Sequence, residues 1–417
     1  MPHSTMTLQD QLELRCGQTL PNRMMRSALS EALCGDDHGP SRRLERAYDR
    51  WSAGGFGLVI TGNVMVDRRH IGEPGNVVVE DDRHQAGLRR WAATFAHVAT
   101  PLWVQINHPG RQASALASRR RPVAPSAVAA KIPGAVTPRA LHDSEIREII
   151  DRFARTAAVL EAAGFDGVEV HGAHGYLVTQ FLSPLANQRD DHWGGDPRRR
   201  RRFLLEIIRA IRGSVSPSFA VGVKLNSADF QRGGFTEDES RDVIRALADE
   251  SIDLLEISGG SYEAPAMLGQ SSQRTQDREA YFLEYAHTVR DLAGDLPIAV
   301  TGGFRSGSAM RGAIGSGDCD IVGLGRSACL VPDAAEAILT GRTDRLEVAR
   351  TQFGLRRALG AVTDLAPLDN ALDMQWYTDQ MHRLGAGKDP DPHRPWWRTA
   401  ASMSLRNGPG AFTPKRS

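Results

Sequence analysis

The chain is poor in the features that mark several large classes of protein. Its 417 residues contain only four cysteines, and no two of them form a Cys-x-x-Cys pair, which excludes the zinc and iron–sulfur sites built on that motif. No apolar run approaches the roughly 20 residues that cross a bilayer, and the start lacks the basic flank and apolar stretch of a secretion signal. We therefore expect a cytoplasmic protein with reduced cysteines and no membrane contact.

An excess of charge of one sign is also missing. Lys and Arg number 51 against 50 Asp and Glu, so no net field attracts nucleic acid or an anionic membrane. The run of five arginines at 198–202 follows Asp196 and Pro197, and we interpret it as the solvated start of a helix. The expected partner is a small-molecule substrate, and the sequence leaves the oligomeric state open.

What the chain does contain is a regular alternation of helical and strand patterns. Leu44, Ala47, Tyr48 and Trp51, for example, recur at helical spacing, two glycines follow, and the apolar run 58–60 comes next. This cycle repeats, and the pattern predicts eight strands, at residues 23–26, 58–60, 102–106, 168–171, 220–225, 254–257, 298–300 and 320–324.

Eight strand–helix units predict an α/β fold of the (β/α)8 TIM barrel type, with a doubly wound open sheet as the structural alternative. We expect a single barrel domain over residues 1–384 and a loosely packed tail, rich in Pro, Gly and Arg, over 385–417. The long connections 107–142, 172–197 and 259–276 all follow strands, so a barrel would gather them on its catalytic face.

Several expected strands carry polar residues on one face. Glu169 and His171 share a side by the two-residue period, as do Lys224 and Asn226, and Glu256 and Ser258. These side chains would point into the barrel. For the two glutamates we favour a buried ion-pair network with Lys224, whereas for Lys224 itself, which is nearer the strand end, we favour a functional role.

Two imidazoles and a phenol follow the strand at 168–171 within six residues. His171, His174 and Tyr176 form a cluster that can move protons and hold an anion. Two histidines three apart could also bind a metal, but no third ligand stands at a convincing spacing, so we expect none. Tyr176 could alternatively be a packing aromatic.

Two glycine segments close the last two strands, Thr301-Gly302-Gly303-Phe304 and Gly323-Leu324-Gly325-Arg326. Backbone amides exposed by glycine at adjacent strand ends are suited to a phosphate, and the region after the seventh and eighth strands is the usual phosphate site of such barrels. Arg326 supplies the counter-charge.

These motifs, in this order from about Leu20 to Pro332, resemble the Old Yellow Enzyme family of FMN-dependent oxidoreductases. The most specific match is the stretch from His171 to Pro184, followed by Asn187-x-Arg189-x-Asp191 and Gly194-Gly195. Further matches are Pro21-Asn22-Arg23, Gln105 to Arg111, Lys224-Leu225-Asn226, Ile257 to Gly260 and the two glycine segments.

The resemblance implies a barrel with FMN at its mouth, which NADPH or NADH reduces and an electron-poor alkene, such as an α,β-unsaturated carbonyl, reoxidises. The residues that it implies around the cofactor are Ser27, Ala28, Leu29, Ser30 and Gly62 along the isoalloxazine, Gln105 at the pyrimidine edge, Lys224 near N1 and the C2 oxygen, and Gly302, Gly303, Gly325 and Arg326 at the phosphate.

For catalysis, the resemblance implies that His171 and His174 donate hydrogen bonds to the substrate carbonyl and that Tyr176 protonates the α-carbon. The chain departs from the family pattern at four positions. Ser30 stands where a Cys or Thr is common, Ala28 and Ala32 replace a proline and an aromatic, and Lys224 replaces an arginine.

Two other functions stay open at this point. A Schiff-base lyase could use Lys224 as its nucleophile and the glycine segments for a substrate phosphate. A flavin-binding protein without turnover is the other alternative. No motif indicates the physiological substrate, the choice between NADPH and NADH, or whether alkene reduction or oxidative demethylation is the cellular reaction.

Overall fold

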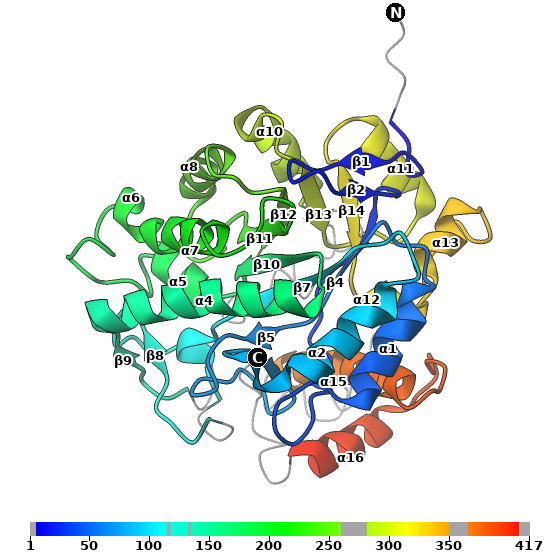
Figure 1. Cartoon of the computed structure of the whole chain (residues 1–417), viewed down its shortest axis with the longest axis horizontal. Coiled ribbons are helices and arrows are strands. Elements are labelled where there is room, and N and C mark those ends of the chain that lie inside the picture. The colour runs from blue at the N-terminus through cyan, green and yellow to red at the C-terminus, as the bar shows by residue number, and fades with distance from the viewer. Residues whose placement is uncertain (1–5, 115–117, 132–134, 260–281, 350–365, 408–417) are drawn as a thin grey trace, which may run out of the picture.

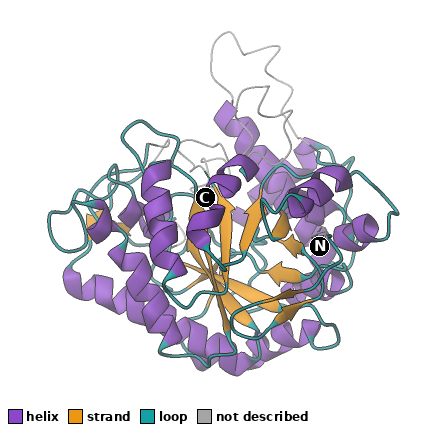
Figure 2. Cartoon of the chain, turned by 90° about the horizontal axis from the view of Figure 1, so that it is seen from above, coloured by secondary structure: helices purple, strands orange, loops and turns teal. Residues whose placement is uncertain are grey.

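Eight parallel strands close into a barrel, and Figure 2 shows the strands at the centre of the molecule with helices around them. The computed structural model describes residues 6–114, 118–131, 135–259, 282–349 and 366–407. Hydrogen bonds join the strands in the order β10, β11, β12, β13, β14, β3, β4, β7, and β7 also pairs with β10, which closes the ring. The bounds are β3 Met24–Arg26, β4 Leu58–Ile60, β7 Leu102–Asn107, β10 Gly167–Gly172, β11 Ala220–Asn226, β12 Leu254–Ser258, β13 Ile298–Thr301 and β14 Ile321–Leu324. All eight expected strands are present, so the TIM barrel is confirmed and the open sheet is wrong.

Amphipathic helices cover the outside of the barrel (Figure 1). Helix α7 shows why they pack there, because its buried side chains recur on one stripe, Phe203, Leu204, Ile207, Ile208 and Ile211. Burying each such side chain contributes roughly 1.5–3 kcal/mol. In the described ranges, no helix combines the length and the apolar character needed to cross a membrane. The helices are α1 Arg42–Ser52, α2 Gln85–Ala92, α4 Asp143–Ala163, α5 Leu177–Leu182, α6 Pro197–Arg200, α7 Arg202–Arg212, α8 Glu237–Ala248, α10 Leu283–Ala293, α11 Gly307–Gly315, α12 Arg326–Leu330, α13 Ala334–Leu339, α15 Ala366–Gly385 and α16 Trp396–Asn407.

Short elements lie in the connections and at one end of the barrel. The antiparallel pair β1 and β2 precedes β3, and the side chains of Leu14 and Leu20 in this hairpin pack against the apolar interior of the barrel. The short elements are β1 Leu12–Glu13, β2 Thr19–Leu20, β5 Val64–Met65, β6 Val77–Val78, β8 Val123–Ala124, β9 Arg139–Ala140, and the 3-10 turns η1 Asp82–His84, η2 Ala93–Phe95 and η3 Gly110–Gln112.

The interior of the barrel changes character along the strands. Its amino-terminal half is apolar and includes Met25, Leu58, Trp103 and Leu254, each at most 1% exposed. Its carboxyl-terminal half is polar and equally buried, with Gln105, Glu169, Lys224, Glu256 and Ser258 on β7, β10, β11 and β12. The functional end of the barrel is therefore the end at which the strands finish.

One arginine of the run 198–202 is not solvated. Asp196 caps α6 through the N–H groups of Arg198 and Arg199, as a helix start requires, but the Arg200 side chain is only 6% exposed. Arg200 donates to the carbonyls of Leu182 and Gly195 and pairs with Glu239 of α8. The expectation of a fully solvated run is wrong at this position, because the guanidinium connects two helices to the loop after α5.

The segment after Gly385 contacts α15, which itself lies beside α1 (Figure 1). The Trp376 indole donates to the Arg394 carbonyl at 2.8 Å, and the Asp391 N–H donates to Gln380 Oε1 at 2.7 Å. Helix α16 follows, so part of the expected tail is packed and helical. The division of the chain at residue 384 stays a prediction.

Candidate active site

A cavity opens at the carboxyl ends of the barrel strands. Residues from β3, β7, β10, β11, β12, β13, β14 and α15, or from the loops that follow these strands, line it. Every predicted site residue except Gly62 lies in this lining: Ser27, Ala28, Leu29, Ser30, Gln105, His171, His174, Tyr176, Lys224, Gly302, Gly303, Gly325 and Arg326.

A sharp turn after β10 brings His171, His174 and Tyr176 together. His174 and Gly175 both take the left-handed backbone conformation, with φ of 62° and 80°. Glycine adopts it without strain, and among other residues His is one that tolerates it. The ring centroids of His171 and His174 are 5.1 Å apart, and those of His171 and Tyr176 are 4.8 Å apart. This backbone turn therefore brings the three rings into one cluster.

Both imidazoles are neutral at physiological pH. Burial, followed by the neighbouring His174 and the Lys224 charge, holds the pKa of His171 well below its ordinary value. Burial and Lys224 lower the pKa of His174 to about 3. The Ala173 N–H donates to His171 Nδ1 at 3.3 Å, so the ring proton is on Nε2. His171 can thus donate one hydrogen bond from Nε2.

Partners from other strands hold His174 and Tyr176. His174 Nε2 lies 2.9 Å from Ser258 Oγ, and the His174 backbone N–H donates to Asn226 Oδ1 at 3.2 Å. Asn63 Nδ2 donates to the Tyr176 hydroxyl at 3.4 Å. Sequence reasoning placed Asn226 and Ser258 on the inner face of the barrel but missed Asn63, which lies between two short strands and belongs to no motif.

Beneath this cluster the strand register pairs the polar side chains. Glu169 stands opposite Gln105, and Lys224 opposite Glu256. Gln105 Nε2 donates to Glu169 Oε2 at 2.6 Å, and Lys224 Nζ lies 2.8 Å from Glu256 Oε1. The predicted ion pair of Lys224 is therefore present with Glu256, whereas Glu169 bonds to the uncharged Gln105 instead of completing an ion pair. Gln105 and Lys224 are also part of the cavity lining.

The two glycine segments lie side by side, because Thr301 on β13 pairs with Gly323 on β14. A Cβ on Gly323 would lie 1.9 Å from Thr301 Oγ1, so any side chain there would displace the Thr301 hydroxyl. Gly302 and Gly303 have φ of 137° and 88°. Arg326 begins α12 and lies 3.5 Å from Asp373 of α15.

The sequence matches the model of the NADH:flavin oxidoreductase / NADH oxidase family over residues 13–345. This chain belongs to that family. It is 39% identical over 345 residues to the NADH-dependent flavin oxidoreductase iliE of Hypocrea jecorina, covering 77% of this chain and 86% of that protein. The family membership confirms the resemblance seen in the motifs.

Solved structures show the same architecture. A 2-naphthoyl-CoA reductase matches with a TM-score of 0.76 and 25% identity, over 80% of this chain and 52% of that chain. An old yellow enzyme homologue from Zymomonas mobilis matches with a TM-score of 0.71 and 22% identity, over 82% of this chain and 95% of that one. The latter likeness concerns the fold. The protein is a flavin-dependent oxidoreductase, with FMN as cofactor and NAD(P)H as reductant.

The chemistry of the cavity fits the cofactor of this flavin oxidoreductase family. Gly302 and Gly303 line the cavity in a backbone conformation that favours glycine, and Arg326 brings a guanidinium to the same lining. Gln105 and Lys224 offer an amide and an ammonium, the groups that suit the polar edge of a flavin. The cavity therefore offers groups suited to a phosphate in one part and groups suited to a flavin ring in another.

A buried polar cluster supports the loop 27–32 behind the cavity of this family member. Glu31 accepts hydrogen bonds from the Tyr48 hydroxyl and from the Gly62 N–H, the latter at 2.8 Å. The Arg26 guanidinium lies 3.9 Å from Glu31 and 3.7 Å from the Trp51 ring centroid. Gly62 thus lies outside the cavity lining and contributes its backbone N–H to this cluster. In the sequence, the one indication of this cluster was the position of Glu31, a charged residue among small and apolar neighbours.

Helix α15 is the other contribution that the sequence did not indicate. Asp373, Tyr377 and Met381 line the cavity beside Arg326. The Arg326 guanidinium lies 5.9 Å from the Tyr377 ring centroid as well as close to Asp373. Nothing in the family motifs, which end near residue 332, points to a helix about 40 residues further along the chain.

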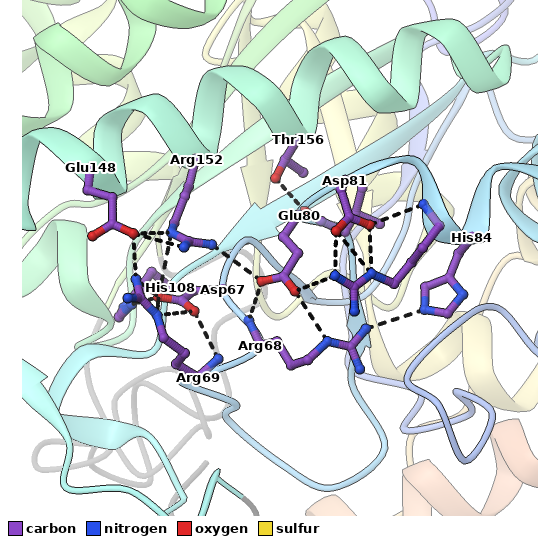
Figure 3. Close-up of polar contacts among 12 residues, drawn as sticks. Asp67, Arg68, Arg69, Glu80, Asp81, His84, His108, Glu148, Arg152 and Thr156 are labelled. Carbon is purple, nitrogen blue, oxygen red and sulfur yellow. Dashed lines mark hydrogen bonds and ion pairs between the residues drawn. The ribbon is translucent and has the colours of Figure 1, made fainter.

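The described residues also hold a group of metal-ligand type, Asp67, His70 and His108, whose ligand atoms lie within 4.8 Å of one another. Figure 3 shows how Arg69 and its neighbours surround Asp67. Arg69 bonds to both Asp67 oxygens, at 2.9 and 3.0 Å. The Gly110 N–H donates to His108 Nδ1, which leaves the proton on Nε2. This donor set does not fit a cation, and the cluster belongs to the ion pairs that join α4 to the loop after β5.

Proposed function

We propose that this protein is an FMN-dependent NAD(P)H oxidoreductase that reduces electron-poor alkenes such as α,β-unsaturated carbonyls. The observation that supports it most is the cluster of two neutral imidazoles and one phenol in the cavity lining. Two hydrogen-bond donors and a proton source are the groups that this reaction requires from a protein. Bound FMN, once reduced by NAD(P)H, would supply a hydride from its N5 to the alkene β-carbon.

His171 and His174 hold the substrate carbonyl oxygen, on which negative charge gathers. His171 donates from Nε2, because the Ala173 N–H occupies Nδ1. Ser258 fixes the orientation of the His174 ring. A neutral imidazole suits this role, since it donates a hydrogen bond without giving up a proton. Each well-aimed donor in such a site is worth about 3 kcal/mol.

Tyr176 then protonates the α-carbon. A phenol is protonated at neutral pH and can deliver its proton to a developing carbanion. Burial of Tyr176, at 4% exposure, keeps water from competing for this step. The hydrogen bond from Asn63 stabilises the phenolate that forms.

The cofactor contacts are part of the same proposal. Ser27, Ala28, Leu29 and Ser30 line the isoalloxazine, and Asn76 Nδ2 donates to Ser30 Oγ at 3.2 Å, which directs the hydroxyl hydrogen elsewhere. Gln105 and Lys224 hold the pyrimidine edge. The phosphate contacts are Gly302, Gly303, Gly325 and Arg326.

The Schiff-base alternative has little support. Lys224 is buried and paired with Glu256, and although burial opposes its charge, Glu256 and Glu169 raise its pKa above the ordinary value. A nucleophilic lysine needs the opposite shift.

A visible spectrum tests the proposal directly. The purified protein is treated anaerobically with NADPH or NADH and then with 2-cyclohexenone. We expect a yellow protein that bleaches with the nicotinamide and recovers its colour with the enone. A flavin that bleaches but is not reoxidised by the enone, or by other activated alkenes, would exclude alkene reduction and leave only the family-level activity.

A further inference from the structure

Two carboxyl groups and one ammonium are enclosed together in the barrel. Glu169 is 1% exposed, Glu256 is 0% exposed and Lys224 is 3% exposed. They stand on the neighbouring strands β10, β12 and β11, with Lys224 in the middle. If both carboxyl groups were ionised, the group would carry one uncompensated negative charge, which costs several kcal/mol in such surroundings.

Among the described residues, no other charge pairs with the second carboxylate. Lys224 Nζ lies against Glu256, whereas Glu169 receives a hydrogen bond from the uncharged amide of Gln105. The titratable groups that face this cluster from β10 and the turn after it are His171 and His174, and burial keeps both neutral. On the remaining side, β13 contributes the hydroxyl of Thr301. The balance must therefore come from a proton.

We propose that Glu169 and Glu256 hold one proton between them, so that the triad of Glu169, Glu256 and Lys224 presents no net charge to the flavin. This inference rests on the proposed placement of Gln105 and Lys224 beside the cofactor. Glu169 and Glu256 are then positioning residues: they do not touch the flavin, but they set the net charge of the triad to which Lys224 belongs.

The surroundings of the two carboxyl groups indicate where the proton stays. Burial and the neighbouring Glu256 raise the pKa of Glu169 well above its ordinary value. Burial also opposes ionisation of Glu256, but Lys224 and the hydrogen bonds from Glu169, Lys224 and Thr301 together lower its pKa. Glu169 is thus the acid and Glu256 the counter-ion of Lys224.

A shared proton has an unusual consequence for substitutions. In Glu169→Gln, the neutral acid is replaced by a neutral amide, so the charge is unchanged. In Glu256→Gln, Glu169 gives up its proton and becomes the counter-ion, so the charge is again unchanged. Only the double variant leaves Lys224 without a counter-ion.

Infrared spectroscopy of the flavin-loaded protein tests the proton itself. The carbonyl stretch of a protonated carboxylic acid should lose one component in Glu169→Gln and the same component in Glu256→Gln. Difference spectra against the wild type are needed, because Glu31, Asp166 and Asp229 also have raised pKa values. Glu206→Gln, at a partly exposed carboxylate paired with Arg202, is the matched control and should lose no such component. An unchanged acid band in both single variants would overturn the proposal.

Flavin potentiometry tests the effect on the cofactor. The ratio of the dissociation constants of oxidised and reduced FMN should stay close to the wild type in both single variants. In the double variant it should shift toward the reduced form by on the order of a hundredfold, the effect of one buried unit charge nearby. Equal shifts in the two single variants that add up in the double variant would mean two independent carboxylates and would overturn the proposal.

The outcomes separate this inference from the proposed function. If the acid band is lost in both single variants but the wild-type protein does not reduce alkenes, the shared proton is supported and only the proposed ene-reductase activity is excluded. The infrared comparison needs only the two single, isosteric variants, so it decides the question even if the double variant does not load flavin.

Discussion

The two halves of the barrel interior are equally buried and hold together in different ways. On β7, Trp103 and Gln105 are two residues apart and face the same side, yet the first packs in the apolar half and the second in the polar half. On β12, Leu254 and Glu256 show the same change. The apolar half is stabilised by excluding water. The polar half is stable only while each polar group keeps a partner inside the barrel.

The sharpest test of the apolar half is Trp103→Ala. The fully buried indole leaves a cavity, and we expect a loss of about 3–5 kcal/mol in the free energy of unfolding. Urea unfolding measures the loss, and the spectrum of the bound flavin should not change. A variant with normal stability and altered flavin colour would mean that the two halves are not separate.

In the polar half, Tyr176→Phe should slow alkene reduction by about 10²–10⁴-fold, because the proton donor is lost while the ring packing stays. Stopped-flow kinetics of the two half-reactions measures this. Reduction of the flavin by NAD(P)H serves as the internal control and should be nearly unaffected. Equal loss in both half-reactions would point to a folding defect and contradict the role of Tyr176.

His174→Ala should weaken the binding of phenols, which mimic the oxyanion, by about a hundredfold, since one donor is lost. The long-wavelength charge-transfer band of the flavin–phenol complex reports the affinity. His174→Asn is the matched control for the backbone, because Asn also tolerates the left-handed conformation that Ala adopts only with strain. Phenol binding as tight as in the wild type in both variants would show that His174 is not a donor to the ligand.

The smallest effect is a dependence of stability on pH. Burial lowers the pKa of His108 and His174 to about 3 and that of His70 to about 4. The unfolded chain binds these protons near pH 6.5, so the stability that neutral histidines allow is lost as the pH falls from about 6.5 toward 3. Each histidine should change the free energy of unfolding by up to about 1.4 kcal/mol per pH unit in this range.

Urea unfolding at pH 7, 6 and 5 measures how the free energy of unfolding changes with pH. In His108→Gln this change should be smaller by the contribution of one histidine. Gln can still accept the hydrogen bond from the Gly110 N–H. Trp103→Ala should lower the stability without changing the slope. An identical slope in His108→Gln would mean that His108 is not a buried neutral group in the folded state.

The fold was largely predictable because it depends on short-range patterns. The apolar runs that became β4, β7 and β10 are brief and bounded by polar or glycine residues, and a two-residue period fixed which of their side chains face inward. The cluster at His171 to Tyr176 was predictable for the same reason, since all its members come from one turn. The polar network followed from the inward face of three strands.

What could not be predicted depends on packing between distant segments. In the run 198–202 every residue is an arginine, and only the approach of the end of α5, of the loop after it and of α8 decides that Arg200 is buried. Asp373 reaches Arg326 from another helix. Glu31 joins the loop residue Gly62 to Tyr48 of α1. No periodic sequence pattern indicates any of these contacts.

The turn after β10 carries a lesson for transplanting this site. Its two consecutive left-handed residues, His174 and Gly175, determine where the second imidazole and the phenol lie relative to the first. The letters His-x-x-His-Gly-Tyr placed at another strand end without that pair of backbone conformations would spread the three rings apart. A designer who copies this chemistry must therefore copy the path of the main chain before the side chains.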